Sequence, residues 1–315
     1  MCEISNTYMP SSSFRQRLKP WMLPIAIVSG ILFHNQISMI QWVVPYLIFT
    51  MLMITFCRVK PTEFRVSKMI WELLAVQLIG SVVIFCVLRP LDLPLAQAVM
   101  ICVLCPTATA APVVTGMLGG SIPKVATYSI VSNLAVALVA PVLFLWVGGG
   151  AADDFDFFAR FMDIALAVGP LIVLPLLVAF LLYFTAPKIH RAIAGVQAVS
   201  FYLWAVSLLV VVGRAVSFVL AEPPSAIPEM VMMAVLALLV CIGQFALGRA
   251  VGRRNGDPVS GGQGLGQKNT VLAIWICLTY FDSISSVGPA AYILWQNIIN
   301  SGQLYMKMRR EAAGA

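Results

Sequence analysis

The chain of 315 residues contains ten long apolar runs, and these runs constrain its fold more strongly than any other feature. A helix needs about 20 mostly apolar residues to cross a bilayer, and only helices or closed barrels satisfy every backbone group inside lipid. The strict alternation of barrel strands is absent. We therefore expect an all-α polytopic membrane protein with ten transmembrane helices. The runs lie at residues 20–36, 41–57, 68–88, 95–118, 124–147, 161–184, 196–220, 229–251, 261–282 and 285–306.

The composition leaves no room for a separate soluble domain. Hydrophobic residues make up 60% of the chain and charged residues 10%, whereas a soluble domain carries roughly 25% charged residues. Lys and Arg outnumber Asp and Glu by 20 to 13, but they lie in short clusters between the apolar runs, as topology signals do. We expect membrane lipid around the chain and no nucleic-acid partner.

The basic clusters also predict an orientation. If the N-terminus is cytoplasmic, most basic residues fall on the cytoplasmic side, and only Arg89 and Arg160 lie in outer loops. This bias predicts a multi-pass protein with both termini in the cytoplasm. It also predicts a cytoplasmic tail at 1–19 and a retained first helix in place of a cleaved signal peptide. A Gram-negative source would place the protein in the inner membrane.

The ten helices divide into two sets of five, 20–147 and 161–306, and an odd number per set inverts the second set in the membrane. The fourth run is interrupted by Cys105–Pro112 (CPTATAAP), and the ninth run by Gly261–Asn269 (GGQGLGQKN). Gly/Pro interruptions at corresponding positions are a pointer to a midplane binding site, because freed backbone groups need protein or a cavity around them. Two ordinary helix kinks are the alternative interpretation.

Residues at the interruptions favour an anionic ligand. Pro112 suits the first turn of a restarted helix, with Thr107 or Thr109 as its cap. Lys268 and Asn269 lie where the ninth helix restarts. Helix N-termini carry partial positive charge and free N–H groups, and Lys268 adds a full charge there. The alternative for Lys268 is snorkelling to the inner interface.

The sequence does not indicate an enzyme. Its two histidines, His34 and His190, fall at opposite membrane surfaces, which argues against a histidine-ligated metal. No nucleophile with a base partner is visible. We expect no catalytic residue, no metal site and no cofactor.

Three segments and one glutamine carry a resemblance to a known family. The first segment is Cys105-Pro106 through Thr109 with Val113-Val114-Thr115, which is similar to the family motif C-P-G-G-T-A-S-N-V-V-T. The second is Gly264 to Asn269, at the place where the family has E-x-G-x-Q-N. The third is Trp295-Gln-Asn-Ile298, which is similar to the family segment W-H-N-I. The glutamine is Gln77 in the third helix. With these residues the chain resembles the bile acid:sodium symporter family, including bacterial homologues of the apical sodium-dependent bile acid transporter, over nearly its whole length.

The resemblance implies a core and a panel. The core would contain the third to fifth and eighth to tenth helices, with the fourth and ninth broken and crossing, and the panel would contain the first, second, sixth and seventh. Substrate would lie between the two, near the crossing. The candidate substrate-binding residues are Thr109, Pro112, Lys268, Asn269, Gln296 and Asn297.

The positions that the family uses for sodium are altered. Its Ser-Asn pair in the fourth helix reads Ala111-Pro112, its acidic residue in the ninth reads Gly264, and the following glutamine reads Lys268. Ser129 takes the place of a threonine, and Gln77 is retained. Hard cations need several oxygen ligands, so we expect no bound sodium. Our hypothesis is that the Lys268 ammonium replaces it.

The function expected from this resemblance is secondary transport of a small organic anion, either a bile-acid-like steroid or a smaller carboxylate, by alternating access. Transport would be sodium-independent, with coupling to protons and facilitated diffusion both open. A non-transporting membrane binding protein or receptor is an alternative. A sodium/proton antiporter is less favoured, because the fourth, fifth and ninth runs contain no carboxylate apart from Asp282 at an outer end.

Overall fold

The computed structural model describes residues 22–58, 65–148 and 157–313, and all its regular elements in these ranges are helices. The predicted tail at 1–19 lies outside the described residues. The helices are α2 (Met22–Leu32), α3 (His34–Ser38), η2 (Gln41–Val43), α4 (Val44–Phe56), α5 (Lys68–Leu88), α6 (Leu93–Leu104), α7 (Ala111–Met117), α8 (Ile122–Val147), α9 (Phe157–Thr185), α10 (Pro187–Gly195), α11 (Gln197–Ala221), η4 (Pro224–Ala226), α12 (Ile227–Arg254), α13 (Pro258–Gly266), α14 (Thr270–Tyr280), η5 (Ser283–Ser286) and α15 (Val287–Ala313).

The prediction of an all-α membrane protein is confirmed. Four helical segments of the described chain are long and apolar enough to cross a bilayer, and further apolar helices are shorter. The four are Lys68–Leu88, Ile122–Val147, Phe161–Thr185 and Pro224–Arg254.

The first apolar run differs from the single helix expected. It is divided into α2, which ends at Leu32, and the short α3, which begins at His34. The backbone of Phe33 leaves the helical region at the junction. The polar His34 side chain then packs on α11, where its Nδ1 lies 3.0 Å from the Ser217 hydroxyl. A polar contact to a neighbouring helix therefore coincides with the point where the run divides.

The fourth and ninth runs are both broken inside the predicted segments, but the second break is shorter than predicted, because α13 continues through the glycines. α6 ends at Leu104 and α7 begins at Ala111, while α13 ends at Gly266 and α14 begins at Thr270. Both broken helices begin in the same way, with an aspartate at the N-cap and a proline in the first turn. Asp92 accepts a hydrogen bond from the Leu95 N–H, and Asp257 accepts one from the Ser260 N–H. Such caps satisfy orphan N–H groups at a helix start.

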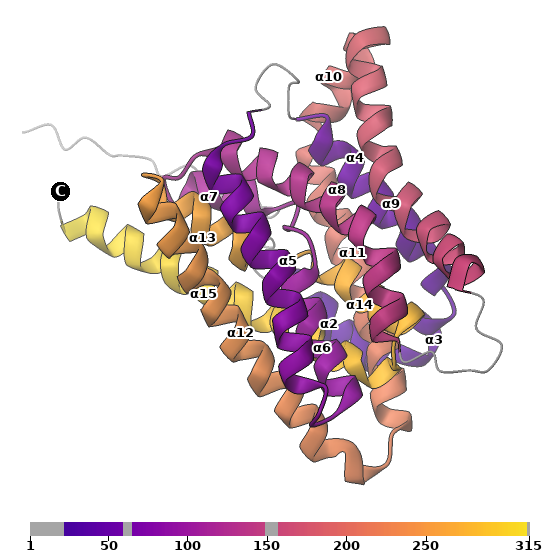
Figure 1. The fold of residues 1–315 in the computed structure, drawn as a ribbon. Coiled ribbons are helices and arrows are strands. Elements are labelled where there is room, and N and C mark those ends of the chain that lie inside the picture. The colour runs from indigo at the N-terminus through magenta and orange to yellow at the C-terminus, as the bar shows by residue number, and fades with distance from the viewer. Residues whose placement is uncertain (1–21, 59–64, 149–156, 314–315) are drawn as a thin grey trace, which may run out of the picture.

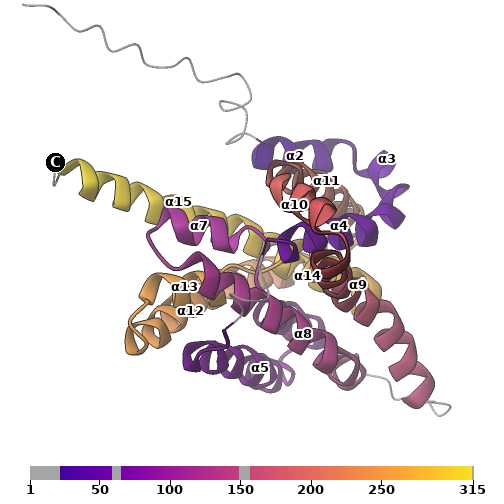
Figure 2. The same ribbon diagram turned by 90° about the horizontal axis from the view of Figure 1, so that it is seen from above.

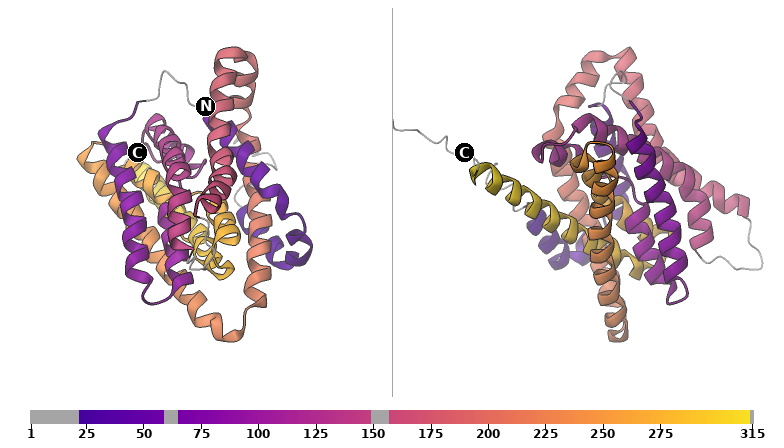
Figure 3. Two further views of the ribbon diagram at one scale, coloured as in Figure 1. Left: turned by 45° about the vertical axis from the view of Figure 1, so that its right-hand side comes forward. Right: turned by 60° about the vertical axis from the view of Figure 1, so that its left-hand side comes forward.

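The helices pack in two groups. α11 contacts α2, α3 and α4, and α9 contacts α4 and α10. The other group brings together α5, α6, α8 and α12 to α15, with α13 lying against α12. Figure 1 shows α6 and α14 towards the middle of the bundle, and Figure 2 shows α2, α3 and α11 gathered on one side, away from α5 and α12. α8 and α9 join the two groups, and α15 extends away from the bundle towards the C-terminus (Figure 3).

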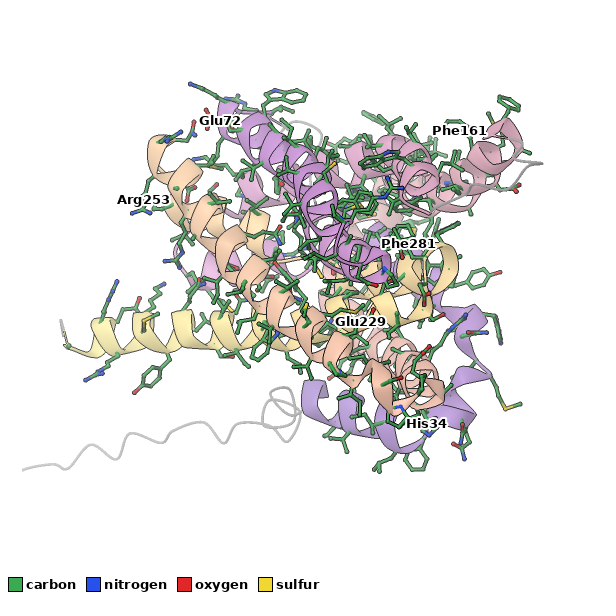
Figure 4. The ribbon with its side chains drawn as sticks, turned by 60° about the horizontal axis from the view of Figure 1, so that its bottom comes forward. His34, Glu72, Phe161, Glu229, Arg253 and Phe281 are labelled. Atoms are coloured by element: carbon green, nitrogen blue, oxygen red, sulfur yellow. The ribbon has the colours of Figure 1, made fainter. Side chains whose placement is uncertain are left out.

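Polar contacts join several helix ends on one side of the molecule. Glu72 at the start of α5 forms an ion pair with Lys68 at 3.7 Å, as its i, i+4 spacing suggests. It also accepts a hydrogen bond of 2.8 Å from Asn255, which follows α12. Figure 4 shows Glu72 near Arg253 at this end, with Glu229 at the opposite end of α12. Lys124 at the start of α8 reaches Asp257 at 3.3 Å. These contacts fix the ends of helices that position the two breaks.

Glycines allow α12 and α13 to approach backbone to backbone. A Cβ atom added at Gly261 would meet the Gly248 carbonyl and would lie 2.8 Å from the Cα of Gly252. Small residues at such contacts let membrane helices pack closely. The position of α13, and with it the second break, depends on these glycines.

We expect Gly261→Ala to lower the free energy of unfolding by about 1–3 kcal/mol, because the added methyl group overpacks a contact between two backbones. Gly243→Ala is the matched control, since no atom lies within 4 Å of a Cβ there and alanine favours the helix. Thermal unfolding in detergent, followed with a dye that reacts with the newly exposed cysteines, compares the two. Equal unfolding temperatures would contradict this account of the contact.

Candidate functional site

The two helix breaks lie against each other and are joined through their backbones. The Asn269 N–H donates to the Pro106 carbonyl at 2.8 Å, and the Ala108 N–H donates to the Gln267 carbonyl at 3.0 Å. These bonds form an antiparallel bridge between Thr107 and Lys268. The interruptions that the sequence predicts at corresponding positions in the two sets of helices are therefore direct neighbours.

The side chains of Thr107 and Lys268 also cross this bridge, and each donates a hydrogen bond to a carbonyl of the other broken helix. The Thr107 hydroxyl donates to the Gly264 carbonyl at 2.7 Å, near the end of α13. The Lys268 ammonium donates to the Val103 carbonyl at 2.8 Å, near the end of α6. Each residue thus satisfies a carbonyl at the end of the other broken helix.

Four consecutive carbonyls at the end of α6 accept hydrogen bonds from side chains outside that helix. Backbone groups freed by a helix end need such partners where water is absent. The donors come from α5, α12 and the second break. The bonds are Gln244 Nε2 to the Cys102 carbonyl at 3.1 Å, Lys268 Nζ to Val103 at 2.8 Å, and Gln77 Nε2 to Leu104 at 2.6 Å and to Cys105 at 3.2 Å.

Lys268 does not snorkel to the interface. Its side chain is 1% exposed, and among the described residues it forms no ion pair with a carboxylate. Its ammonium instead lies at the C-terminal end of α6, where a helix carries partial negative charge. The sequence led us to expect this charge beside the helix N-termini. Instead, the long lysine side chain extends past the N-termini to the C-terminal end of α6, where the carbonyl groups lack partners within the helix.

Two other predicted residues share this position. Asn269 caps α14 by accepting from the Leu272 N–H at 3.2 Å. Gln296, on α15, accepts from the Lys268 N–H at 2.9 Å and donates to the Lys268 carbonyl at 3.4 Å. Its amide therefore holds the backbone of Lys268 from the side opposite the bridge. Asn297 is not part of this group, since its amide donates to the Ile293 carbonyl within α15.

Thr109 and Pro112 lie near the break but on a different surface. Pro112 is in the first turn of α7, as predicted, but neither threonine caps that helix. Ala110 occupies the cap position without a side-chain bond, because the Thr107 hydroxyl is engaged by Gly264. Thr109 and Pro112 line a cavity of about 80 Å³ together with Arg58. Lys268, Asn269, Gln296 and Asn297 do not line this cavity.

At the positions that the resemblance assigns to sodium, the polar side chains form hydrogen bonds with neighbouring protein groups. The Gln77 side-chain oxygen accepts from the Tyr128 hydroxyl at 2.7 Å and from the Ser132 hydroxyl at 2.9 Å. Ser129 donates to the Thr107 carbonyl at 3.4 Å. A Cβ atom at Gly264 would lie 3.0 Å from the Tyr128 ring, so this position has little space for an acidic side chain. Ala111 and Pro112 are buried and bring no side-chain oxygen.

Sequence reasoning did not assign a role here to the two buried tyrosines. Tyr292, on α15, donates to the Gly266 carbonyl at the end of α13 and accepts from Gln244, both at 2.9 Å. Tyr128 also pairs with a glutamine beside the end of α6, but here the tyrosine hydroxyl donates to the Gln77 side-chain oxygen. A signal was present, since a tyrosine inside an apolar run needs a partner for its hydroxyl.

Among the described residues, His, Cys, Asp and Glu form no group of three or more that could hold a metal ion. In comparisons with known proteins, the sequence matches no family model and no curated protein. The function of this protein is therefore inferred from the geometry of the two breaks and from the residues around them.

We expect Gln77→Leu to lower the free energy of unfolding by about 1–3 kcal/mol, because it leaves buried hydroxyls and carbonyls without a partner. Ser81→Ala is the matched control on α5: Ser81 is equally buried, but its hydroxyl donates only to the Leu78 carbonyl of the same helix. Thermal unfolding in detergent measures both. A Gln77→Leu protein as stable as Ser81→Ala would contradict the role of Gln77 as a link between helices.

Proposed function

We propose that this protein is a secondary transporter of a small organic anion that works by alternating access. The observation that carries the proposal is the pair of broken helices, whose breaks are joined by an antiparallel bridge that contains the buried Lys268. Broken helices at the membrane midplane are the usual setting for substrate and ion sites in secondary transporters. In this proposal the chain is similar to the bile acid:sodium symporters and is not an enzyme.

Local symmetry supports the proposed arrangement of ten transmembrane helices as two inverted repeats, 20–147 and 161–306. Each half contains a broken helix that begins with an aspartate cap and a proline. Each half also contains a glutamine–tyrosine pair at the carbonyl end of that helix, Gln77 with Tyr128 and Gln244 with Tyr292. The pairs come from the third and fifth helices of each proposed repeat. Similar parts in similar places favour a common plan for the two halves.

We assign the two packing groups to the proposed panel and core. The panel would be the first, second, sixth and seventh transmembrane helices, represented by α2 to α4, α9 and α11. The core would contain the broken helices and their neighbours α5, α8, α12 and α15. Alternating access would then be a movement of one group against the other. Both termini would be cytoplasmic, which places the helix ends around Glu72 and Lys124 on the cytoplasmic side.

The position of Lys268 supports sodium-independent transport. A sodium ion between broken helices would be held by carbonyl and carboxylate oxygens. Here a tethered ammonium lies against the Val103 carbonyl, and the other assigned positions supply no carboxylate. In this proposal the ammonium takes the place of the sodium ion as the cation that joins the two breaks.

We expect Lys268→Gln to lower uptake into proteoliposomes roughly 10-fold or more, because a hydrogen bond to a charged group contributes about 1.5–3 kcal/mol. Lys307→Gln is the matched control, since its ammonium also donates to a carbonyl at a helix end, that of Met117 at 2.8 Å, but is partly exposed. The control protein is expected to transport normally. Unchanged sodium-independent uptake by Lys268→Gln would refute the role of the lysine.

The second test replaces sodium by potassium during uptake of labelled taurocholate into proteoliposomes, with and without a pH gradient. We expect the same rate in both salts, because the tethered ammonium occupies the place of the ion. A response to the pH gradient would indicate proton coupling. Strict sodium dependence would contradict the proposal.

A receptor and a carrier are separated by counterflow. Liposomes loaded with unlabelled anion should accumulate labelled anion from outside, because a carrier exchanges substrate across the bilayer. Binding without counterflow would favour the alternative of a non-transporting binding protein.

A further inference from the structure

An organic anion that enters this protein needs a positive group that is free to bind it. Lys268 does not provide one, because its ammonium is fully buried and already donates to the Val103 carbonyl. A second cation, Arg58, lies two residues after the end of α4. Among the described residues this guanidinium forms no ion pair, and it lines the cavity beside the first helix break.

The cavity brings Arg58 together with two hydroxyl groups from separate parts of the fold. Thr55 lies one helical turn before Arg58 on α4, and Thr109 lies in the break before α7. The Thr55 hydroxyl donates to the Met51 carbonyl at 2.9 Å and keeps its oxygen as an acceptor. Thr109 forms no side-chain hydrogen bond with another described residue, so its hydroxyl is free to donate. Pro112 and Ala126 supply an apolar wall.

The size of the cavity limits what it can hold. Its volume of about 80 Å³ is several times the roughly 10–15 Å³ that a cavity needs, on the same measure, to hold one water molecule. A carboxylate group fits such a space. Guanidinium is also the cation best matched to a carboxylate, because its planar fork donates two parallel hydrogen bonds.

We propose that Arg58 is the anion-binding residue of this protein and holds the carboxylate head group of its substrate in the cavity formed with Thr55 and Thr109. This inference rests on the proposed transport of an organic anion and deepens it. The head group is bound between α4 of one packing group and the break of the other. The remainder of a large substrate lies outside this cavity, so a small monocarboxylate satisfies the site as well as a bile acid does.

A neighbouring cavity provides the control. Arg58 also lines a second cavity of about 500 Å³ with Tyr183, His190 and Arg191, between α4 and α10. Arg191 is exposed and lines this second cavity without lining the first. Arg191→Gln therefore removes a guanidinium of the same kind from the adjacent site and leaves the proposed one intact.

The test is binding of benzoate and cholate, a small and a large monocarboxylate, to the purified full chain in detergent, measured by titration calorimetry, with benzyl alcohol as the uncharged counterpart of benzoate. Arg58→Gln is expected to weaken binding of both anions roughly 10- to 100-fold, because a charge-assisted bond is lost. Arg58→Lys should lose less, since it keeps the charge without the fork. Arg191→Gln should bind as the unmodified protein does. Benzyl alcohol should respond to none of these changes.

Three outcomes overturn the proposal and locate the fault. Unchanged binding by Arg58→Gln, at a normal unfolding temperature, refutes the anion site and leaves the transport proposal in place. An equal loss in Arg191→Gln moves the anion to the second cavity. If the unmodified protein neither binds these anions nor exchanges them across liposomes, the transport proposal and the site fail together.

Discussion

An interrupted helix inside a membrane leaves carbonyl groups that lipid cannot satisfy, and the centre of this molecule is organised by that requirement. The carbonyls at the end of α6 receive donors from α5, α12 and the second break. The end of α13 is satisfied by Thr107 from the first break and by Tyr292 from α15. Neither broken helix could keep its shape without the other. The two parts of the chain are therefore mutually dependent at the level of single hydrogen bonds.

Small residues and large buried residues complement each other around the breaks. The glycines of α13 let α12 approach to backbone contact, and Gly264 leaves the space that the Tyr128 ring occupies. Tyr128 and Tyr292 then place hydroxyl groups at depths where no water is available to bind the backbone. Most polar atoms in this region are consequently hydrogen-bonded, as is expected where an unpaired polar group costs several kcal/mol. The side-chain oxygens of Gln244 and Asn133 are buried exceptions that have no partner among the described residues.

Much of the fold could be predicted from the sequence, because the evidence is local. Apolar runs indicate helices, and the Gly/Pro segments indicate where α6 and α13 end. The partners across the breaks could not be predicted in this way. Thr107 or Thr109 was expected to cap α7, yet the Thr107 hydroxyl donates to the Gly264 carbonyl. The Lys268 charge was expected near a helix start, yet the ammonium donates to the Val103 carbonyl at a helix end. Which carbonyl takes which donor depends on tertiary positions that spacing along the chain does not encode. The division of the first run at Phe33 likewise coincides with a contact between His34 and Ser217 of a distant helix.

A cation that is covalently part of the chain cannot be released on either side of the membrane. In the transport that we propose, no ion gradient is linked to the substrate while Lys268 keeps its proton, and a monovalent anion crosses as an unaccompanied negative charge. A membrane potential contributes about 2.3 kcal/mol per 100 mV to such a movement. In a cell that is negative inside, this field drives the anion outward. In the transport that we propose, the lysine that replaces sodium would thus make the electrical potential part of the force that sets the direction of flow.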